Sequence, residues 1–257
     1  MTRVGIGGIE LTGADETIVA GGLSLPVHVY RPEPGAERPS AALILCPGGI
    51  GTGMFEIMEW IAGAARDAGI FTVTTSWRAP SPEHDPDDVS MVVDWLQQQP
   101  DVDGERIAIM GMSRGGNATL RAAALDTRLK LVVTFGPATN FVQQAEGTAV
   151  YAPGRHRMLV DWLGDPVEKR SFYEKVQAIG YADRIKQPVL MVHGQHDMHS
   201  PPEQSIWMKE AIEAAGNSDV DLRIVPMMGH YGDVIPNSYG FDQLRAIIIP
   251  YLQQRLK

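Results

Sequence analysis

Hydrophobic and polar positions along this chain form two kinds of strand-like segment. Short uninterrupted apolar runs are typical of strands that are buried on both faces of a parallel sheet. Such runs occur at 41–46, 70–75, 106–110, 129–135 and 188–193. Segments 23–31 and 221–226 alternate apolar and polar residues instead. This alternation predicts half-buried strands, the first antiparallel to its neighbour and the second at an edge of the sheet.

Helical periodicity fills the intervals between these runs. Apolar residues recur at steps of three and four, and glycine or proline ends two of the segments. The predicted helices span 54–69, 85–100, 117–126, 202–216 and 240–256. Pro250 is expected to kink or break the last helix. Strands that alternate with helices predict an α/β fold, in which a mostly parallel sheet carries helices on both faces.

Residues 136–187 interrupt this alternation of strands and helices. We expect this stretch to form several short helices over the edge of the sheet, as a lid would. The chain of 257 residues contains no internal repeat, low-complexity tract or obvious linker. We therefore expect one domain, residues 1–257, with 136–187 as its lid or insertion.

Composition and charge exclude several classes of protein. Twenty-two Lys and Arg residues against 31 Asp and Glu residues give a net charge of −9, without a basic stripe, so neither nucleic acid nor a membrane surface is an expected partner. Cys46 is the only cysteine, so no internal disulfide can form. The chain has no signal-peptide pattern and no apolar run of the roughly 18–20 residues that span a bilayer. We expect a cytoplasmic protein that binds a small-molecule substrate, and homo-oligomerisation stays open.

The stretch "GMSRGG" (111–116) directly follows an apolar run. Glycine weakens both strands and helices, so its concentration here indicates a turn too tight for side chains. Between a strand and a helix, the pattern G-x-S-x-G is typical of a nucleophile elbow, which exposes the serine at the end of the strand. Gly111, Gly115 and Gly116 are the predicted elbow residues, and Ser113 is the predicted nucleophile. A glycine-rich helix start with a capping serine is the structural alternative.

A serine nucleophile needs a base, and the base needs an acid that orients it. Asp197 lies shortly after the strand predicted at 188–193, and His230 follows the strand predicted at 221–226. Both side chains are therefore expected at the sheet edge where Ser113 emerges. The chain order Ser, Asp, His is one of the known orders of a catalytic triad.

Other roles for these residues stay open at the level of sequence. Asp197 could cap the helix that follows it, and His230 could be an ordinary loop histidine. Asp161, Asp165 and Asp233 are rival acids. They rank below Asp197, because none of them follows a clear core strand at this place in the chain order.

An oxyanion hole should complete such a site. The backbone N–H of Arg114, the residue after the nucleophile, is one expected donor. The second donor should come from the glycine-rich loop "CPGGIGTGM" (46–54), with Gly49 or Ile50 as the candidates. A flexible glycine turn without a catalytic role is the alternative.

Metal and thiol chemistry are not expected. His193, His196 and His199 fall at steps of three, but they lie at a strand end and in a loop, and no H-E-x-x-H motif occurs. Cys46 belongs to a buried-looking strand, which favours a packing role over a nucleophilic one. We expect neither a metal nor a cofactor.

These motifs resemble those of the α/β-hydrolase superfamily, and within it the catalytic domains of the prolyl oligopeptidase family and the dienelactone hydrolase-like esterases. The resembling motifs are G-M-S-R-G-G at 111–116, H-G-Q-H-D at 193–197 and G-H-Y-G at 229–232. The resemblance covers about residues 20–256. It implies an α/β-hydrolase fold of about eight strands with a helical lid-like insertion, and a triad of Ser113, Asp197 and His230.

The chain departs from these relatives in three respects. Its oxyanion loop reads C-P-G-G where many relatives have H-G-G, so the position of the second donor is not fixed by the resemblance. The chain has no room for the N-terminal β-propeller of the large oligopeptidases, which weakens a peptidase interpretation. Ser113 stands where dienelactone hydrolases use cysteine.

We therefore predict a serine hydrolase that cleaves a small-molecule ester through an acyl-enzyme. The first alternative is a peptidase or aminopeptidase, which an acid-lined pocket would favour; residues 82–88 could supply the acids. An acyltransferase or ring-forming enzyme would be favoured if 136–187 excluded water. A binding protein on an inactive scaffold is the last alternative.

Overall fold

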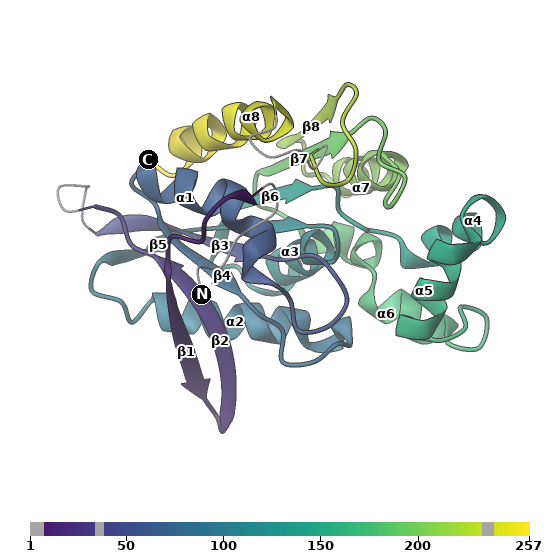
Figure 1. Ribbon diagram of the computed structural model, residues 1–257, viewed down its shortest axis with the longest axis horizontal. Helices are drawn as coiled ribbons and strands as arrows, with labels where there is room; N and C mark the ends of the chain where they lie inside the picture. The colour runs from purple at the N-terminus through teal and green to yellow at the C-terminus, as the bar shows by residue number, and fades with distance from the viewer. Residues whose placement is uncertain (1–7, 34–38, 233–238) are drawn as a thin grey trace.

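The sheet forms the centre of the molecule. The computed structural model describes residues 8–33, 39–232 and 239–257. Within these ranges eight strands form one sheet in the order β1-β2-β4-β3-β5-β6-β7-β8 (Figure 1). The pairs β1–β2 and β2–β4 are antiparallel, and the others are parallel. This arrangement confirms the predicted α/β-hydrolase fold class. The strands are β1 (Ala14–Ala20), β2 (Leu23–Tyr30), β3 (Ser40–Cys46), β4 (Phe71–Thr75), β5 (Val102–Met112), β6 (Leu129–Phe135), β7 (Val189–Gly194) and β8 (Val220–Val225).

Helices cover both faces of the sheet (Figure 1). Helices α1 and α8 pack on one face, and α2, α3 and α7 pack on the other. No helix in the described ranges is long and apolar enough to cross a bilayer. The helices are α1 (Glu59–Asp67), α2 (Asp85–Leu96), α3 (Arg114–Leu125), α7 (Glu203–Ala214) and α8 (Tyr239–Arg255), with the short 3-10 helices η2 (Phe55–Met58) and η3 (Pro82–His84) before α1 and α2.

Strand β3 shows why the central runs are apolar without interruption. Ala42 and Ile44 pack into the cluster beneath α2, α3 and α7, whereas Leu43 and Leu45 pack into the cluster beneath α1 and α8. All four side chains are fully buried. Because side chains alternate between two covered faces, each position of the strand must be apolar. Burial of one such Leu or Ile side chain contributes about 1.5–3 kcal/mol.

Strand β1 is an element that the hydrophobic pattern does not predict. Its sequence, ADETIVA, is mostly exposed, because it forms the outer strand of a hairpin at the edge of the sheet. Gly21 and Gly22 make the turn to β2, with φ angles of 57° and 80°. Glycine reaches this left-handed region without the steric penalty of a side chain. Edge position and exposure remove the periodic signal on which the prediction depends.

Helix α8 continues through Pro250. The break that the sequence analysis allowed at this residue does not occur. Pro250 is exposed, so the carbonyl that loses its helical hydrogen bond faces the solvent side of the helix. Leu244, Ile248 and Leu252 are buried on the opposite side. Packing of this apolar stripe against the sheet outweighs the local cost of the proline.

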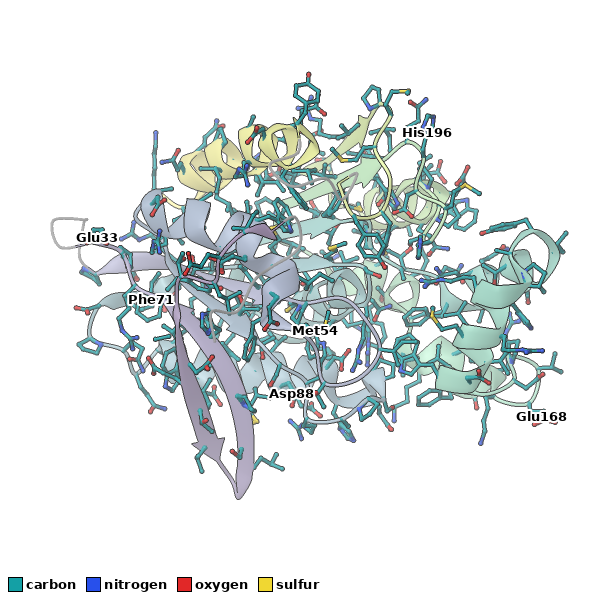
Figure 2. The ribbon with its side chains drawn as sticks, viewed as in Figure 1. Glu33, Met54, Phe71, Asp88, Glu168 and His196 are labelled. Atoms are coloured by element: carbon teal, nitrogen blue, oxygen red, sulfur yellow. The ribbon has the colours of Figure 1, made fainter. Side chains whose placement is uncertain are left out.

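Residues 136–187 form a largely separate group of helices, as expected. Helices α4 (Phe141–Tyr151), α5 (Pro153–Leu163) and α6 (Arg170–Val176) lie beside the sheet (Figure 1). Figure 2 shows Glu168 at the outer end of this group. The three helices share an apolar cluster of their own, which includes Phe141, Leu159 and Tyr173. The 3-10 helix η4 (Ala178–Arg184) packs instead into the core of the sheet. Movement of α4–α6 as a lid stays a prediction.

Candidate active site

Ser113 lies in a strained turn between β5 and α3. Its φ of 56° and ψ of −119° place a non-glycine residue at positive φ, a conformation that costs on the order of 1–3 kcal/mol. Three backbone hydrogen bonds hold the turn. The Ser113 N–H donates to the Phe135 carbonyl at 3.1 Å, and the Ser113 carbonyl accepts from Asn117 N at 3.1 Å and Ala138 N at 3.2 Å. The neighbouring strand and helix thus impose the strained conformation.

The glycines around Ser113 are required by close backbone contacts. A Cβ atom on Gly111 would lie 2.1 Å from the Gly115 carbonyl oxygen, and one on Gly115 would lie 1.9 Å from the Cys46 carbonyl oxygen. A Cβ atom on Gly116 would lie 2.7 Å from Pro137 Cβ. Because backbone atoms cannot move aside as the end of a flexible side chain can, only glycine fits at Gly111 and Gly115.

Asp197 and His230 meet at the same edge of the sheet, beyond the ends of β7 and β8. The distance between His230 Nδ1 and Asp197 Oδ2 is 2.6 Å. The other carboxylate oxygen, Oδ1, accepts the backbone N–H groups of His199 at 2.9 Å and Ser200 at 2.8 Å. The carboxylate therefore fixes the His230 ring through Nδ1, and it leaves Nε2 as the nitrogen that can exchange a proton.

The charge on Asp197 is stabilised by its neighbours. Burial alone would raise the pKa of this carboxyl group, but hydrogen bonds from His193 and His230 and the Ser200 N–H hold the pKa well below its usual value. His193 Nε2 lies 3.3 Å from Asp197 Oδ2. The His193 ring is itself held by the Ser205 hydroxyl and the Ser200 carbonyl, each at 2.7 Å. Asp197 is therefore ionised at neutral pH although it is buried.

Ser113 and His230 line one cavity of about 290 Å³. The cavity lies between the carboxyl ends of the sheet strands and helices α4 and α5, which contribute Phe141, Arg155 and Trp162. Its volume is at the lower end of the range for small-molecule sites. Two much larger hollows, of about 540 and 560 Å³, lie elsewhere on the surface, and one of about 300 Å³ adjoins the cavity at Ile50, Met158 and Trp162; none of them includes Ser113.

The glycine-rich loop after β3 forms one side of the cavity. Gly48, Gly49 and Ile50 line it. Gly48 is buried, and a Cβ atom on it would lie 3.0 Å from Ser113 Cβ, so this loop residue is in close contact with the serine. Gly49 has a φ of 92°, which favours glycine. Met54, farther along the same loop, is exposed at the rim (Figure 2).

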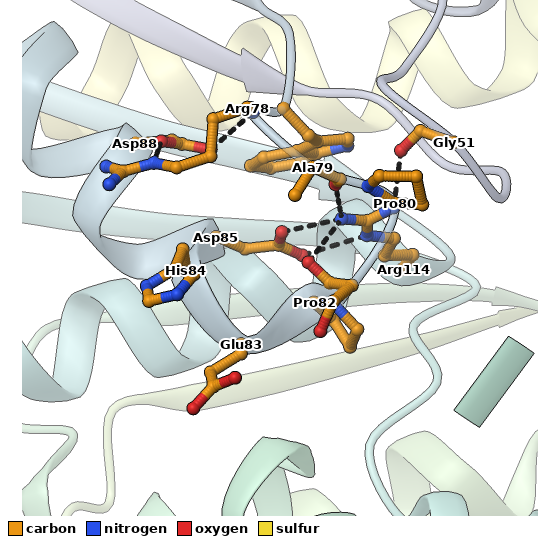
Figure 3. Close-up of polar contacts among 12 residues, drawn as sticks. Gly51, Arg78, Ala79, Pro80, Pro82, Glu83, His84, Asp85, Asp88 and Arg114 are labelled. Carbon is orange, nitrogen blue, oxygen red and sulfur yellow. Dashed lines mark hydrogen bonds and ion pairs between the residues drawn. The ribbon is translucent and has the colours of Figure 1, made fainter. Parts of the chain in front are cut away.

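The Arg114 side chain is a structural anchor that sequence reasoning did not foresee. Its backbone follows Ser113 at the cavity, but its guanidinium group is buried and forms a double ion pair with Asp85, at 2.9 and 2.7 Å (Figure 3). It also donates to the carbonyls of Gly51 at 2.8 Å and Ala79 at 3.1 Å. Arg114 thus ties the loop after β3 to the start of α2, beside the neighbouring pair of Arg78 and Asp88.

The same guanidinium group contacts two indole rings. It lies over the rings of Trp77 and Trp162, at 5.3 and 5.4 Å from their centroids. Trp162 belongs to α5 and donates its indole N–H to the Pro80 carbonyl at 2.8 Å. Cation–π contacts of this kind contribute about 0.5–2 kcal/mol each. The elbow and the helices above the cavity are therefore joined through Arg114.

The other candidate residues lie away from Ser113 or have structural roles. Asp161 is exposed on α5, and Asp165 accepts the backbone N–H groups of Val167 and Glu168 just after that helix. Asp233 lies outside the described residues. Cys46 is fully buried, and burial raises the pKa of its thiol, as a packing role requires.

The three histidines near Asp197 do not share a site. His193 is buried and His196 is exposed, while His199 stacks on the His230 ring at 5.1 Å between centroids. Across the described part of the chain, no three His, Cys, Asp or Glu residues are placed to hold a metal ion.

Comparison with known proteins assigns this arrangement to a family. Residues 75–254 match the sequence profile of the prolyl oligopeptidase family. The chain belongs to the prolyl oligopeptidase family. This membership confirms the resemblance inferred from the serine, aspartate and histidine motifs, and it places the chain in a family of hydrolases.

Relatives of this prolyl oligopeptidase-family chain include esterases. Acetyl esterase Axe7A of Xylanibacter ruminicola is 28% identical over 140 residues, which are 54% of this chain and 30% of the esterase. Ethyl acetate hydrolase of Pseudomonas putida is 25% identical over 272 residues, with 91% of this chain and 80% of that enzyme covered. The chain thus spans less than a third of the acetyl esterase to which it is similar.

Solved structures share the fold at low sequence identity. The acylaminoacyl peptidase of Pyrococcus horikoshii has a TM-score of 0.78 and 17% identity, with 96% of this chain and 42% of that chain covered. Est1E from Butyrivibrio proteoclasticus has a TM-score of 0.75 and 17% identity, with 95% and 99% covered. A chain that is matched over nearly its whole length and a chain that is matched over less than half of it therefore share this fold.

The elbow geometry makes a stability prediction. Gly115→Ala should destabilise the protein by about 3 kcal/mol or more, because the new methyl group meets the Cys46 backbone and the strained turn must shift. Gly154→Ala is the matched control, since Gly154 lies in α5 with no atom within 4 Å of an added Cβ, and alanine favours the helix by about 0.5–1 kcal/mol. Urea unfolding measures both effects; equal midpoints for Gly115→Ala and the wild type would contradict the steric argument.

The buried ion pair beneath the elbow makes a second prediction. Arg114→Met should cost about 3–5 kcal/mol of unfolding free energy, because it leaves the Asp85 carboxylate buried without its partner. Asp85→Asn added to this variant should recover part of the loss, because the amide carries no charge. A double-mutant cycle of urea unfolding measures this coupling. Strictly additive effects of the two substitutions would show that the pair is not coupled.

The lowered pKa of Asp197 makes a prediction on acid stability. The carboxylate contributes stability above its unfolded pKa of about 3.9, and this contribution is lost as pH falls toward the lower folded-state pKa. The wild type should therefore exceed Asp197→Asn in unfolding free energy at pH 5, and the difference should shrink as pH falls below about 4. Urea titrations at pH 5, 4 and 3 measure it; a difference that grows as the pH falls would reverse the sign of the argument.

Proposed function

We propose that this protein is a serine hydrolase that cleaves small-molecule esters through an acyl-enzyme. One observation carries the proposal. Ser113, in a strained turn, and His230, held at Nδ1 by Asp197 at 2.6 Å, line the same cavity. A catalytic triad consists of a hydroxyl group, an imidazole and a buried ionised carboxylate in this order.

The proposed reaction has two steps. Ser113 Oγ attacks the carbonyl carbon of the ester while His230 Nε2 takes its proton, and His230 then gives that proton to the departing alcohol. Water, deprotonated by His230, attacks the acyl-enzyme and releases the acid and Ser113. Asp197 orients the imidazole ring and stabilises its positive charge in both steps. These steps require no metal or cofactor.

The backbone around Ser113 supplies the proposed oxyanion hole. The Arg114 N–H, at the start of α3, is one donor, and the helix dipole adds to its effect. The second donor comes from the loop at Gly49 or Ile50, which lines the cavity and whose neighbour Gly48 lies against Ser113. Loss of one such donor typically costs about 2.7–4 kcal/mol of transition-state stabilisation. The hydrogen bond from the Arg114 side chain to the Gly51 carbonyl holds the two donor segments together.

Several observations favour an ester over a peptide. An aminopeptidase needs an acidic side chain to bind the substrate amine, but none of the described residues that line the cavity is Asp or Glu. None of the four acids in residues 82–88 lines the cavity. Asp85 pairs with Arg114 and Asp88 with Arg78, while Glu83 pairs with Lys175 and Asp87 with His84. Relatives named acetyl esterase and ethyl acetate hydrolase agree with this choice.

Hydrolysis is favoured over acyl transfer by the rim of the cavity. Ile50 and Met54 line the cavity and are 46% and 58% exposed, so water can reach the site in this conformation.

In the proposal the chain acts as one domain of residues 1–257, with α4–α6 as the cover of the site, and it acts on small molecules in the cytoplasm.

The experiment combines Ser113→Ala with a panel of substrates. The wild type should hydrolyse p-nitrophenyl acetate and butyrate but not alanyl p-nitroanilide, and Ser113→Ala should lower kcat/KM for the esters by about 10⁴-fold or more. Ser24→Ala, at an exposed site on the β1–β2 hairpin, is the control and should leave the rates unchanged.

Labelling by a fluorophosphonate provides an independent measurement. Mass spectrometry should locate the label on Ser113 in the wild type and find none on the Ser113→Ala protein. Equal ester hydrolysis by the wild type and Ser113→Ala would refute the proposal. Cleavage of the anilide at rates equal to those of the esters would favour the peptidase alternative.

A further inference from the structure

Arg155 is a cation beside the proposed site, and none of the residues that the structure describes is its ionic partner. It lies on α5 and lines the same cavity as Ser113 and His230. Its guanidinium group contacts Met158 Sδ, at 3.8 Å from Nη1, and thioether sulfur is a weak acceptor. Its Nε atom is buried without a hydrogen-bond partner. No residue in the described ranges forms an ion pair with it.

Other arginines of this chain are better satisfied than Arg155. Buried Arg121 also lacks an ion pair among the described residues, but it donates to the carbonyls of Pro82 at 2.8 Å and Glu83 at 3.3 Å. Arg114 pairs with Asp85, Arg128 with Asp94 and Asp126, and Arg170 with Glu146 and Glu174. Those three side chains lie in the core, on the surface and on α6. Arg155, by contrast, is half-buried against a cavity and has no ion-pair partner among residues 8–33, 39–232 and 239–257.

The surroundings of Arg155 make this arrangement costly for the folded protein. Burial lowers the pKa of the guanidinium group, and the acidic groups of Tyr231, Asp197 and Tyr151 only partly oppose that effect. The carboxylate of Asp197 is engaged by His193 and His230, so it is not a partner for Arg155. A charge that is removed from water without a partner destabilises a protein. Its position suits it to bind an anion that enters the cavity.

The rest of the cavity defines the class of that anion. Met158, Leu159 and Phe141 give it apolar walls, and about 290 Å³ accommodates a short aliphatic chain. A guanidinium group offers a planar fork that matches a carboxylate in a bidentate pair. Low-polarity surroundings strengthen such a pair. The walls and the fork together suit a substrate that has a short carbon chain with an ester at one end and a carboxylate at the other.

We propose that Arg155 binds a carboxylate of the substrate, so that the preferred substrates are singly charged esters such as the half-esters of short dicarboxylic acids. This inference rests on the proposed hydrolase function and names its substrate class. Arg155 is then a residue that sets specificity, and it takes no part in bond breaking.

The experiment compares esters that differ only in the terminal group. Monoethyl glutarate is paired with ethyl pentanoate to place the carboxylate on the acyl side. The second pair, 4-acetoxybutanoate and butyl acetate, places it on the alcohol side. Hydrolysis of each is followed by pH-stat titration at pH 7.5, and the readout is the ratio of kcat/KM for the charged ester to that for the neutral ester.

Three variants accompany the wild type. Arg155→Met removes the charge and keeps an unbranched apolar stem, whereas Arg155→Lys keeps the charge but loses the fork. Arg157→Met is the matched control, because Arg157 is exposed on the same helix and does not line this cavity. Thermal unfolding of each variant shows whether it folds. Arg155→Met should be at least as stable as the wild type, since it removes an unpaired half-buried charge.

The proposal predicts a wild-type preference for the charged ester of at least one pair. Arg155→Met should reduce this preference by about ten- to a hundredfold, mainly through a higher KM, because hydrogen bonds to charged groups are of that strength. Arg155→Lys should retain part of it, and Arg157→Met all of it. Arg157→Met should leave the rates on the neutral esters unchanged, and the two Arg155 variants are judged by the ratio of charged to neutral ester, which cancels any general change in rate.

The two proposals fail in different ways. If the wild type cleaves the neutral esters in a Ser113-dependent reaction and shows no preference for charged esters, the inference about Arg155 is overturned and the hydrolase stands. An equal preference in the wild type and Arg155→Met also overturns it. If Ser113→Ala cleaves all four esters as fast as the wild type, the proposed function itself fails.

Discussion

The contact between the Gly115 backbone and the Cys46 carbonyl is the constraint on which the proposed site depends. It allows α3 to begin directly beside the end of β3, and this closeness forces Ser113 into a conformation that a side-chain-bearing residue rarely adopts. The strain persists because the turn is held by a hydrogen bond from Ser113 N–H to the Phe135 carbonyl and by two from Asn117 and Ala138 N–H to the Ser113 carbonyl. The same closeness brings the loop after β3, with Gly48, against the serine.

The edge of the parallel sheet converts distant positions in the chain into neighbours. Asp197 and His230 are 33 residues apart and follow adjacent strands, so their side chains meet at 2.6 Å beyond the strand ends. Strand order and direction are consequences of apolar runs that alternate with helices. For this reason the central strands, the elbow glycines and the pairing of Asp197 with His230 were within reach of sequence analysis.

Other features were out of reach, for physical reasons that differ from case to case. Strand β1 lacks a hydrophobic period because it is exposed at an edge, and α8 passes through Pro250 because its packing on the sheet outweighs a local rule. The partners of Arg114 and the isolation of Arg155 depend on which loops come together in three dimensions. No spacing in the sequence distinguishes these two arginines, although Arg114 pairs with Asp85 and Arg155 has no ion-pair partner in the described part of the chain.

The separate apolar cluster of α4–α6 has a consequence for how this architecture diversifies. Phe141, Leu159 and Tyr173 pack with one another, largely apart from the side chains that support the serine turn. Substitutions in these helices therefore alter the walls of the cavity while leaving the reaction machinery intact. Selection can act on them largely independently of Ser113, Asp197 and His230. This independence ends at contacts such as Trp162, held between Arg114 and the Pro80 carbonyl, and Gln144, which donates to the His199 carbonyl at 2.6 Å. A lineage could exchange its substrates by rebuilding α4–α6 around these fixed contacts.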